Sequence, residues 1–156
     1  MQQIYRIVAV ADRLSLSLLW PMPAQYGDAL LSHRAKPTAV IAYLLEHQGS
    51  GGLYSSLRER GWITSLSASL AVSTSTFSLF SLELNMTRSG WDRHADACVA
   101  VYRYLSLMKQ LSETEWRVVY EEVKTVAALK FRYHKHTKPN KRAWELAVRM
   151  GVCFFY

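Results

Sequence analysis

Hydrophobic and polar residues alternate with a period of two along several stretches of this chain. Residues 14–20 alternate leucine with serine, which predicts a strand with one buried face. Residues 76–86 alternate in the same way, and the Ser-Thr-Ser-Thr run at 73–76 predicts a hairpin turn after a strand over 62–72. The apolar stretch 3–10 predicts a further strand.

Between and after these strands, apolar residues recur at helical spacing. Pro37 is well placed to open a helix, and that helix should stop at the glycines that begin with Gly49. The other expected helices cover residues 53–60, 91–110, 113–134 and 141–150. Strands, a helix pair, a hairpin and then helices predict an α+β fold, with helices packed on one face of a mainly antiparallel sheet.

Composition and charge limit the classes of fold and function that this chain can have. The chain has 156 residues, of which 50% are hydrophobic, enough for one domain with a proper core. Its net charge is +7, and residues 130–142 hold six of the 19 Lys and Arg with no acid among them. This run of cations is typical of a solvated helix C-terminus and the loop that follows it. The alternative is a small basic module that binds RNA or another polyanion.

The cysteines and the hydropathy pattern bear on location. Only Cys98 and Cys153 are present, so the sequence predicts no disulfide framework and no paired-cysteine metal site. No apolar run approaches the roughly 20 residues of a membrane-spanning helix, and the N-terminal stretch lacks the pattern of a signal peptide. These features predict a cytoplasmic protein with no membrane partner.

Residues 43–47 carry the most informative chemistry. They read Tyr-Leu-Leu-Glu-His, an H-x-x-E-H zinc motif whose first histidine is replaced by Tyr43. The intact motif places two imidazoles on one helical face beside a glutamate that serves as base. Glu46 and His47 remain, but a phenol is a poor zinc ligand. The sequence therefore predicts a degenerate motif with no catalytic residue and no metal.

Several spaced segments resemble the pitrilysin-type zinc metallopeptidases, in particular the insulysin and nardilysin branch. The run 44–62 is similar to the family's helix, its H-E-G-x-G-S-L turn and its K-x-K-G-W helix end. Shorter matches are Gln-Ile-Tyr-Arg-Ile-Val at 3–8, Leu-Leu-Trp-Pro-Met-Pro at 18–23, Lys-Pro at 36–37, Glu115-Trp116 and Phe131-Arg132.

The resemblance implies a place within a larger enzyme. Such peptidases have four homologous domains around a closed chamber, and only the first carries the zinc motif. This chain resembles the second, non-catalytic domain over residues 1–156, and we expect it to be truncated at its C-terminus. The implied partners are a peptide substrate and a catalytic domain that holds the zinc. An autonomous metallopeptidase with a degenerate zinc site is a further alternative.

The resemblance also implies a peptide site. In relatives, the edge strand after the Gly-Trp pair accepts peptide by strand addition, which places Leu66, Ser67 and Ala68 at the site. Gln48 stands where the family has a carboxylate for the peptide's amine, and Glu46 stands where it has a glycine.

A metal site would need ligands from a second helix. In catalytic domains of the family, a glutamate on a later helix is the third zinc ligand. If this chain binds a metal, the resemblance implies that the ligands are His47, Glu121 and Glu122.

Overall fold

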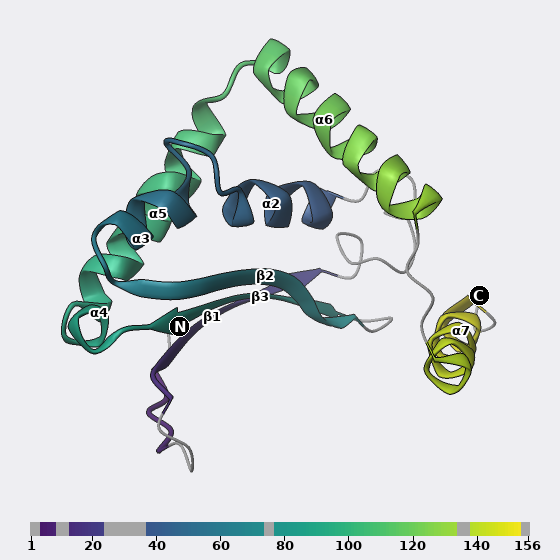
Figure 1. Cartoon of the computed structure of the whole chain (residues 1–156), viewed down its shortest axis with the longest axis horizontal. Helices are drawn as coiled ribbons and strands as arrows, with labels where there is room; N and C mark the ends of the chain where they lie inside the picture. Colours follow the sequence, from purple (N-terminus) through teal and green to yellow (C-terminus); the bar gives the residue numbers. More distant parts are fainter. Residues whose placement is uncertain (1–3, 9–12, 24–36, 74–76, 134–137, 154–156) are drawn as a thin grey trace.

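The computed structural model describes residues 4–8, 13–23, 37–73, 77–133 and 138–153. Its strands β1 (Ser15–Pro23), β2 (Ile63–Ser73) and β3 (Phe77–Met86) form an antiparallel sheet in the order β1-β3-β2. The helices are α2 (Pro37–Glu46), α3 (Leu53–Glu59), α4 (Arg88–Asp92), α5 (His94–Gln110), α6 (Glu113–Arg132) and α7 (Pro139–Cys153). The α+β prediction is confirmed (Figure 1).

The alternating leucines define one buried face of the sheet. Leu18 on β1 and Ala68 on β2 both pair with the fully buried Leu82 of β3. One residue along, Glu83 pairs with Ser17 and with Ser67, and all three are exposed. The period of two in the sequence therefore separates a core face from a solvent face, as predicted.

Helices α2, α3 and α5 cover the core face (Figure 1). Leu45 of α2, Leu57 of α3 and Val101 of α5 are fully buried, and they belong to the same core cluster as Leu82 and Leu84. Beyond α5, helix α6 diverges from the loop that joins the two, and α7 lies apart from the sheet (Figure 1). No described helix is long and apolar enough to cross a bilayer.

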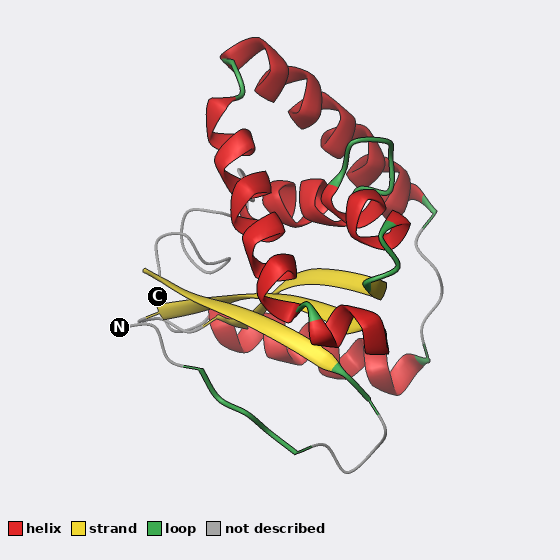
Figure 2. Ribbon diagram, turned by 90° about the vertical axis from the view of Figure 1, so that its left-hand side faces the viewer, coloured by secondary structure: helices red, strands yellow, loops and turns green. Residues whose placement is uncertain are grey.

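The strand predicted at 3–10 is wrong where the structure describes it. Residues 4–8 form no strand and run as a loop away from the sheet (Figure 2). Ile4 and Val8 are 91% and 94% exposed. A strand needs a neighbouring backbone to satisfy its N–H and C=O groups. Within the part of the chain that the structure describes, β1 pairs with β3 alone. Residues 3, 9 and 10 lie outside the described part of the chain.

The helix predicted at 91–110 is two helices that meet at Arg93. The hydroxyl of Thr87 accepts a hydrogen bond from the Gly90 amide at 3.0 Å, which starts α4 one turn earlier than predicted. A side chain on Gly90 would overlap the backbone carbonyl of Trp62. This close approach packs α4 against Trp62, the residue just before β2.

The remaining boundaries follow from ordinary capping. Ser112 and Glu115 form a capping box at the start of α6. At the end of α3, Gly61 has φ +69°, and the Trp62 amide donates to the Leu57 carbonyl at 3.1 Å, as in a Schellman motif. Helix α7 begins at Pro139, two residues before its predicted start.

Candidate functional site

The degenerate motif lies at the C-terminal end of α2, beside the outer edge of β2. Among the described residues β2 pairs with β3 alone, so its other side is an edge of the described sheet. Helix α2 ends at Glu46, and the glycine turn then leads into α3. The motif residues Tyr43, Glu46 and His47 lie at this end of α2 or directly after it.

Glu46 contacts the strand on which peptide binding is predicted. Its Oε1 atom accepts a hydrogen bond from the backbone amide of Ala68 at 2.7 Å. Backbone groups alternate sides along a strand, so the amide of Leu66 also faces the open edge, whereas Ser67 faces β3. The structure therefore brings Glu46 together with Ala68 and gives that edge donor an internal partner.

The hydroxyl of Tyr43 contacts α6. Its hydroxyl donates a hydrogen bond to Oε1 of Glu122 at 2.9 Å. This hydrogen bond, with burial and the negative charge of Glu122 as smaller causes, raises the pKa of Tyr43 above its ordinary value. The tyrosine that replaces the histidine therefore links α2 to α6.

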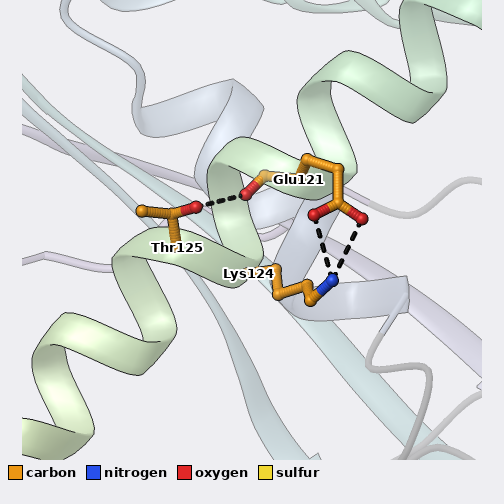
Figure 3. A network of polar contacts seen from close by, with 3 residues as sticks. All are labelled: Glu121, Lys124 and Thr125. Carbon is orange, nitrogen blue, oxygen red and sulfur yellow. Dashed lines mark hydrogen bonds and ion pairs between the residues drawn. The ribbon is translucent and has the colours of Figure 1, made fainter.

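The side chain of Glu121 contacts its own helix, α6. Its two carboxylate oxygens accept hydrogen bonds from the Lys124 ammonium at 3.1 and 3.0 Å, and its backbone carbonyl accepts one from the Thr125 hydroxyl at 2.8 Å (Figure 3). Glu121 and Glu122 therefore do not act as a pair: one contacts α2 and the other contacts the next turn of α6.

The ring of His47 lies against the ring of Tyr43, with centroids 5.8 Å apart. Across the described residues, no three His, Cys, Asp or Glu side chains gather closely enough to hold a metal ion. The three residues named as possible ligands, His47, Glu121 and Glu122, are thus not assembled into one metal-binding group in that part of the chain.

The glycine turn sets the position of the motif. Gly51 has φ +82°, a conformation that favours glycine, and a Cβ on Gly52 would lie 2.6 Å from the His47 carbonyl oxygen. The Ser55 hydroxyl bonds to the carbonyls of Gly49 and Gly52 at 2.8 and 3.0 Å. Gln48, predicted to meet a peptide amine, is exposed and has no polar side-chain contact within the described ranges.

One residue that positions the site was not predicted. The hydroxyl of Tyr104 on α5 donates to the backbone carbonyl of Leu44 at 3.2 Å, one of the helix-end carbonyls that lack an intrahelical partner. Tyr104 is half-buried, and burial raises its pKa. Nothing in its sequence context distinguishes it from the other tyrosines, because the contact joins residues 60 positions apart.

Comparisons with known proteins agree on one family. A family model described as the peptidase M16 inactive domain matches residues 2–123. A nardilysin-like protein of Arabidopsis thaliana is 31% identical over 152 residues, covering 95% of this chain and 14% of that protein. Human nardilysin is 26% identical over 141 residues, covering 88% of this chain and 12% of nardilysin.

A solved structure supports the fold. The crystal structure of pitrilysin superimposes with a TM-score of 0.75 at 20% identity, covering 88% of this chain and 14% of the pitrilysin chain. The present chain thus spans about one seventh of the length of these relatives.

Proposed function

Because this chain belongs to the family of peptidase M16 inactive domains, we propose that it binds extended peptide along the β2 edge. It is a non-catalytic domain of the type found in nardilysin- and insulysin-like peptidases. In this proposal, the hydrolysis is performed by a separate catalytic domain that holds the zinc. The present chain contributes a wall of the substrate chamber, and its partners are that domain and the peptide.

The observation that carries the proposal is the open edge of β2 next to the end of α2. Leu66 and Ala68 turn their backbone groups outward there, and the neighbouring side chains of Ser67 and Ser69 are small. Peptide addition to a sheet edge uses main-chain hydrogen bonds for affinity. Small side chains allow a second backbone to approach, so this edge suits peptides of varied sequence.

The contacts of the degenerate motif support a role without catalysis. Tyr43 is bound to Glu122, and Glu46 is bound to the Ala68 amide. In an active motif, a glutamate acts on a metal-bound water and needs its carboxylate directed there. Here both side chains serve contacts within the fold, so we infer that this chain does not cleave peptides by itself.

A proline scan of the two edge strands tests the proposal. Proline removes a backbone donor, so Leu66→Pro should reduce the binding of an extended fluorescent peptide at least tenfold, measured by anisotropy. Ser17→Pro is the matched control. Met86 donates to Leu14 across the β1–β3 pair, so by alternation the Ser17 amide faces the opposite open edge. Equal binding by both variants, with folded circular dichroism spectra, would contradict the proposal.

A second candidate function has its own observation. Phe131 and Tyr133 are 88% and 74% exposed beside Lys130 and Arg132 at the end of α6. Exposed aromatics among cations suit stacking with single-stranded RNA. Binding of a fluorescent oligonucleotide that weakens steeply with salt, and is lost in Phe131→Ala, would favour this module. Residues 134–137 of the segment lie outside the described part of the chain.

The cytoplasmic location expected from cysteine usage stays a prediction. Cys98 is a half-buried free cysteine on α5, and burial raises its pKa.

A further inference from the structure

Glu46 occupies an unusual position for a carboxylate. It is the last residue of α2, where the negative end of the helix dipole disfavours a second negative charge. No Lys or Arg side chain forms an ion pair with it among the described residues. The one hydrogen bond of its side chain in that part of the chain is the 2.7 Å contact from the Ala68 amide.

That contact uses the donor that strand addition needs. A strand added to β2 would place a carbonyl oxygen about 2.9 Å from an outward-facing amide nitrogen. The Oε1 atom of Glu46 already lies 2.7 Å from the Ala68 nitrogen. The carboxylate therefore takes the place of a peptide carbonyl, and an arriving peptide must displace it.

We propose that Glu46 is a gating residue, which competes with peptide for the Ala68 amide at the β2 edge. Only a peptide that pairs with β2 strongly enough to displace the carboxylate then binds. The inference rests on the proposed function of that edge. A hydrogen bond to a carboxylate is stronger than one to a neutral carbonyl, so the exchange of Glu46 for a peptide carbonyl is unfavourable at this position. Weakly pairing strands are thereby rejected.

Three variants and one probe test this competition. The probe is a short fluorescent peptide rich in Thr and Val, acetylated and amidated so that it carries no terminal charge. Glu46→Ala should bind it about tenfold more tightly than the wild type, the expected gain from removing one charge-assisted competitor. Glu46→Gln retains a neutral acceptor and should fall between the two. Glu59→Ala is the matched control, because Glu59 is the exposed last residue of α3.

The outcomes separate the two proposals. If the wild type binds the probe and Glu46→Ala binds it equally or more weakly, the gate is overturned while the peptide-binding edge stands. If neither protein binds, the edge is not a peptide site and both proposals fall. A gain in Glu59→Ala equal to that in Glu46→Ala would show a general charge effect and overturn the gate.

Hydrogen exchange tests the gate without any peptide. In the wild type, the Ala68 amide should exchange more slowly than the Leu66 amide, although both face the open edge. In Glu46→Ala, the Ala68 amide should exchange as fast as Leu66, while amides bonded to β3 are unchanged. Equal protection of Ala68 in the two proteins would overturn the inference even if the affinities differ.

Discussion

The sheet with α2, α3 and α5 differs sharply from the pair α6 and α7. The first region, called here the body, buries Leu45, Leu57 and Leu82 completely. Helix α6 has no buried residue in twenty positions, and Phe131 at its end and Trp144 of α7 are 88% and 67% exposed. The body therefore closes a core of its own, whereas the two C-terminal helices present apolar side chains to their surroundings.

Local interactions account for the helical state of α6. It has a capping box, an ion pair between Glu113 and Arg117 at 3.5 Å and another between Glu121 and Lys124 at 3.0 Å. Exposed pairs of this kind contribute little to stability because solvent screens them. Within the described residues, the hydrogen bond from Tyr43 to Glu122 is the one side-chain hydrogen bond between α6 and the body.

A shallow apolar hollow also separates the regions. It has a volume of about 420 Å³ and is lined from β1, α2, α5 and α6, including Trp20, Ile41, Tyr102 and Trp116. Incompletely covered aromatic surface is typical of an interface. The hollow and the exposed apolar side chains of α6, such as Val118 at 69% and Leu129 at 51%, thus have the character of an interface surface.

The largest expected effect lies in the body. Leu82→Ala should lower the free energy of unfolding by about 2–5 kcal/mol, because it leaves a cavity in a fully buried site. Val123→Ala on the half-buried side of α6 should cost less than about 1 kcal/mol. Urea denaturation followed by circular dichroism measures both. Similar losses of unfolding free energy in the two variants would show that α6 shares the core of the body, which would contradict the difference between the two regions.

A smaller effect is expected at the close approach between β2 and α4. Gly90→Ala should cost about 1–3 kcal/mol, because its Cβ would overlap the Trp62 carbonyl and force the backbone to shift. Gly51→Ala is the control: its Cβ meets no atom within 4 Å, but φ is +82°, a strain of about 1–2 kcal/mol. Thermal melting measures the stability of both variants. A larger loss of stability in Gly51→Ala than in Gly90→Ala would contradict this ordering.

The next effect should be confined to α6. Ser112→Ala removes the capping box and should cost the helix about 1 kcal/mol. Hydrogen exchange should then accelerate in the first turns of α6 and stay unchanged in β3. If the exchange of β3 also accelerates, α6 is coupled to the body and the two regions are one cooperative unit.

The same capping box gives α6 a pH dependence. The Ser112 hydroxyl, and then its backbone amide, lower the pKa of Glu115. A lowered pKa stabilises the folded helix at pH values above the ordinary pKa of glutamate, and this stabilisation is lost as the pH falls through the lowered value. Acid should therefore loosen the start of α6 first. Amide exchange between neutral pH and pH 3 measures this, and Ser112→Ala, which loses the hydroxyl but keeps the backbone amide, should reduce the difference.

The smallest effect is expected at the link between the regions. Tyr43→Phe removes one exposed hydrogen bond to Glu122 and should cost less than about 1 kcal/mol. Because the pKa of Tyr43 is raised, the link is complete below the ordinary pKa of tyrosine and is lost as the pH rises through the raised value. Exchange in α6 should change more than exchange in α2. A large loss of global stability would contradict this order.

Patterns within single elements predicted the fold well, whereas contacts between elements were not predictable from them. The leucine–serine alternation at 14–20 identified β1 and its buried face. The similar apolar stretch at residues 4–8 forms no strand, because pairing depends on a neighbour that the pattern does not reveal. Glu46 and Tyr43 were singled out as motif residues. Their partners Ala68 and Glu122 lie 22 and 79 positions away, which no local spacing indicates.

The central claim is that the residues of the decayed motif serve contacts of the fold and hold no metal. The zinc content of the purified chain, measured by elemental analysis after exposure to zinc and dialysis, tests it most directly. The account predicts far less than one zinc per chain, with the same value in His47→Ala. Near one zinc per chain in the wild type, lost in His47→Ala, would contradict it and assign His47 to a metal site.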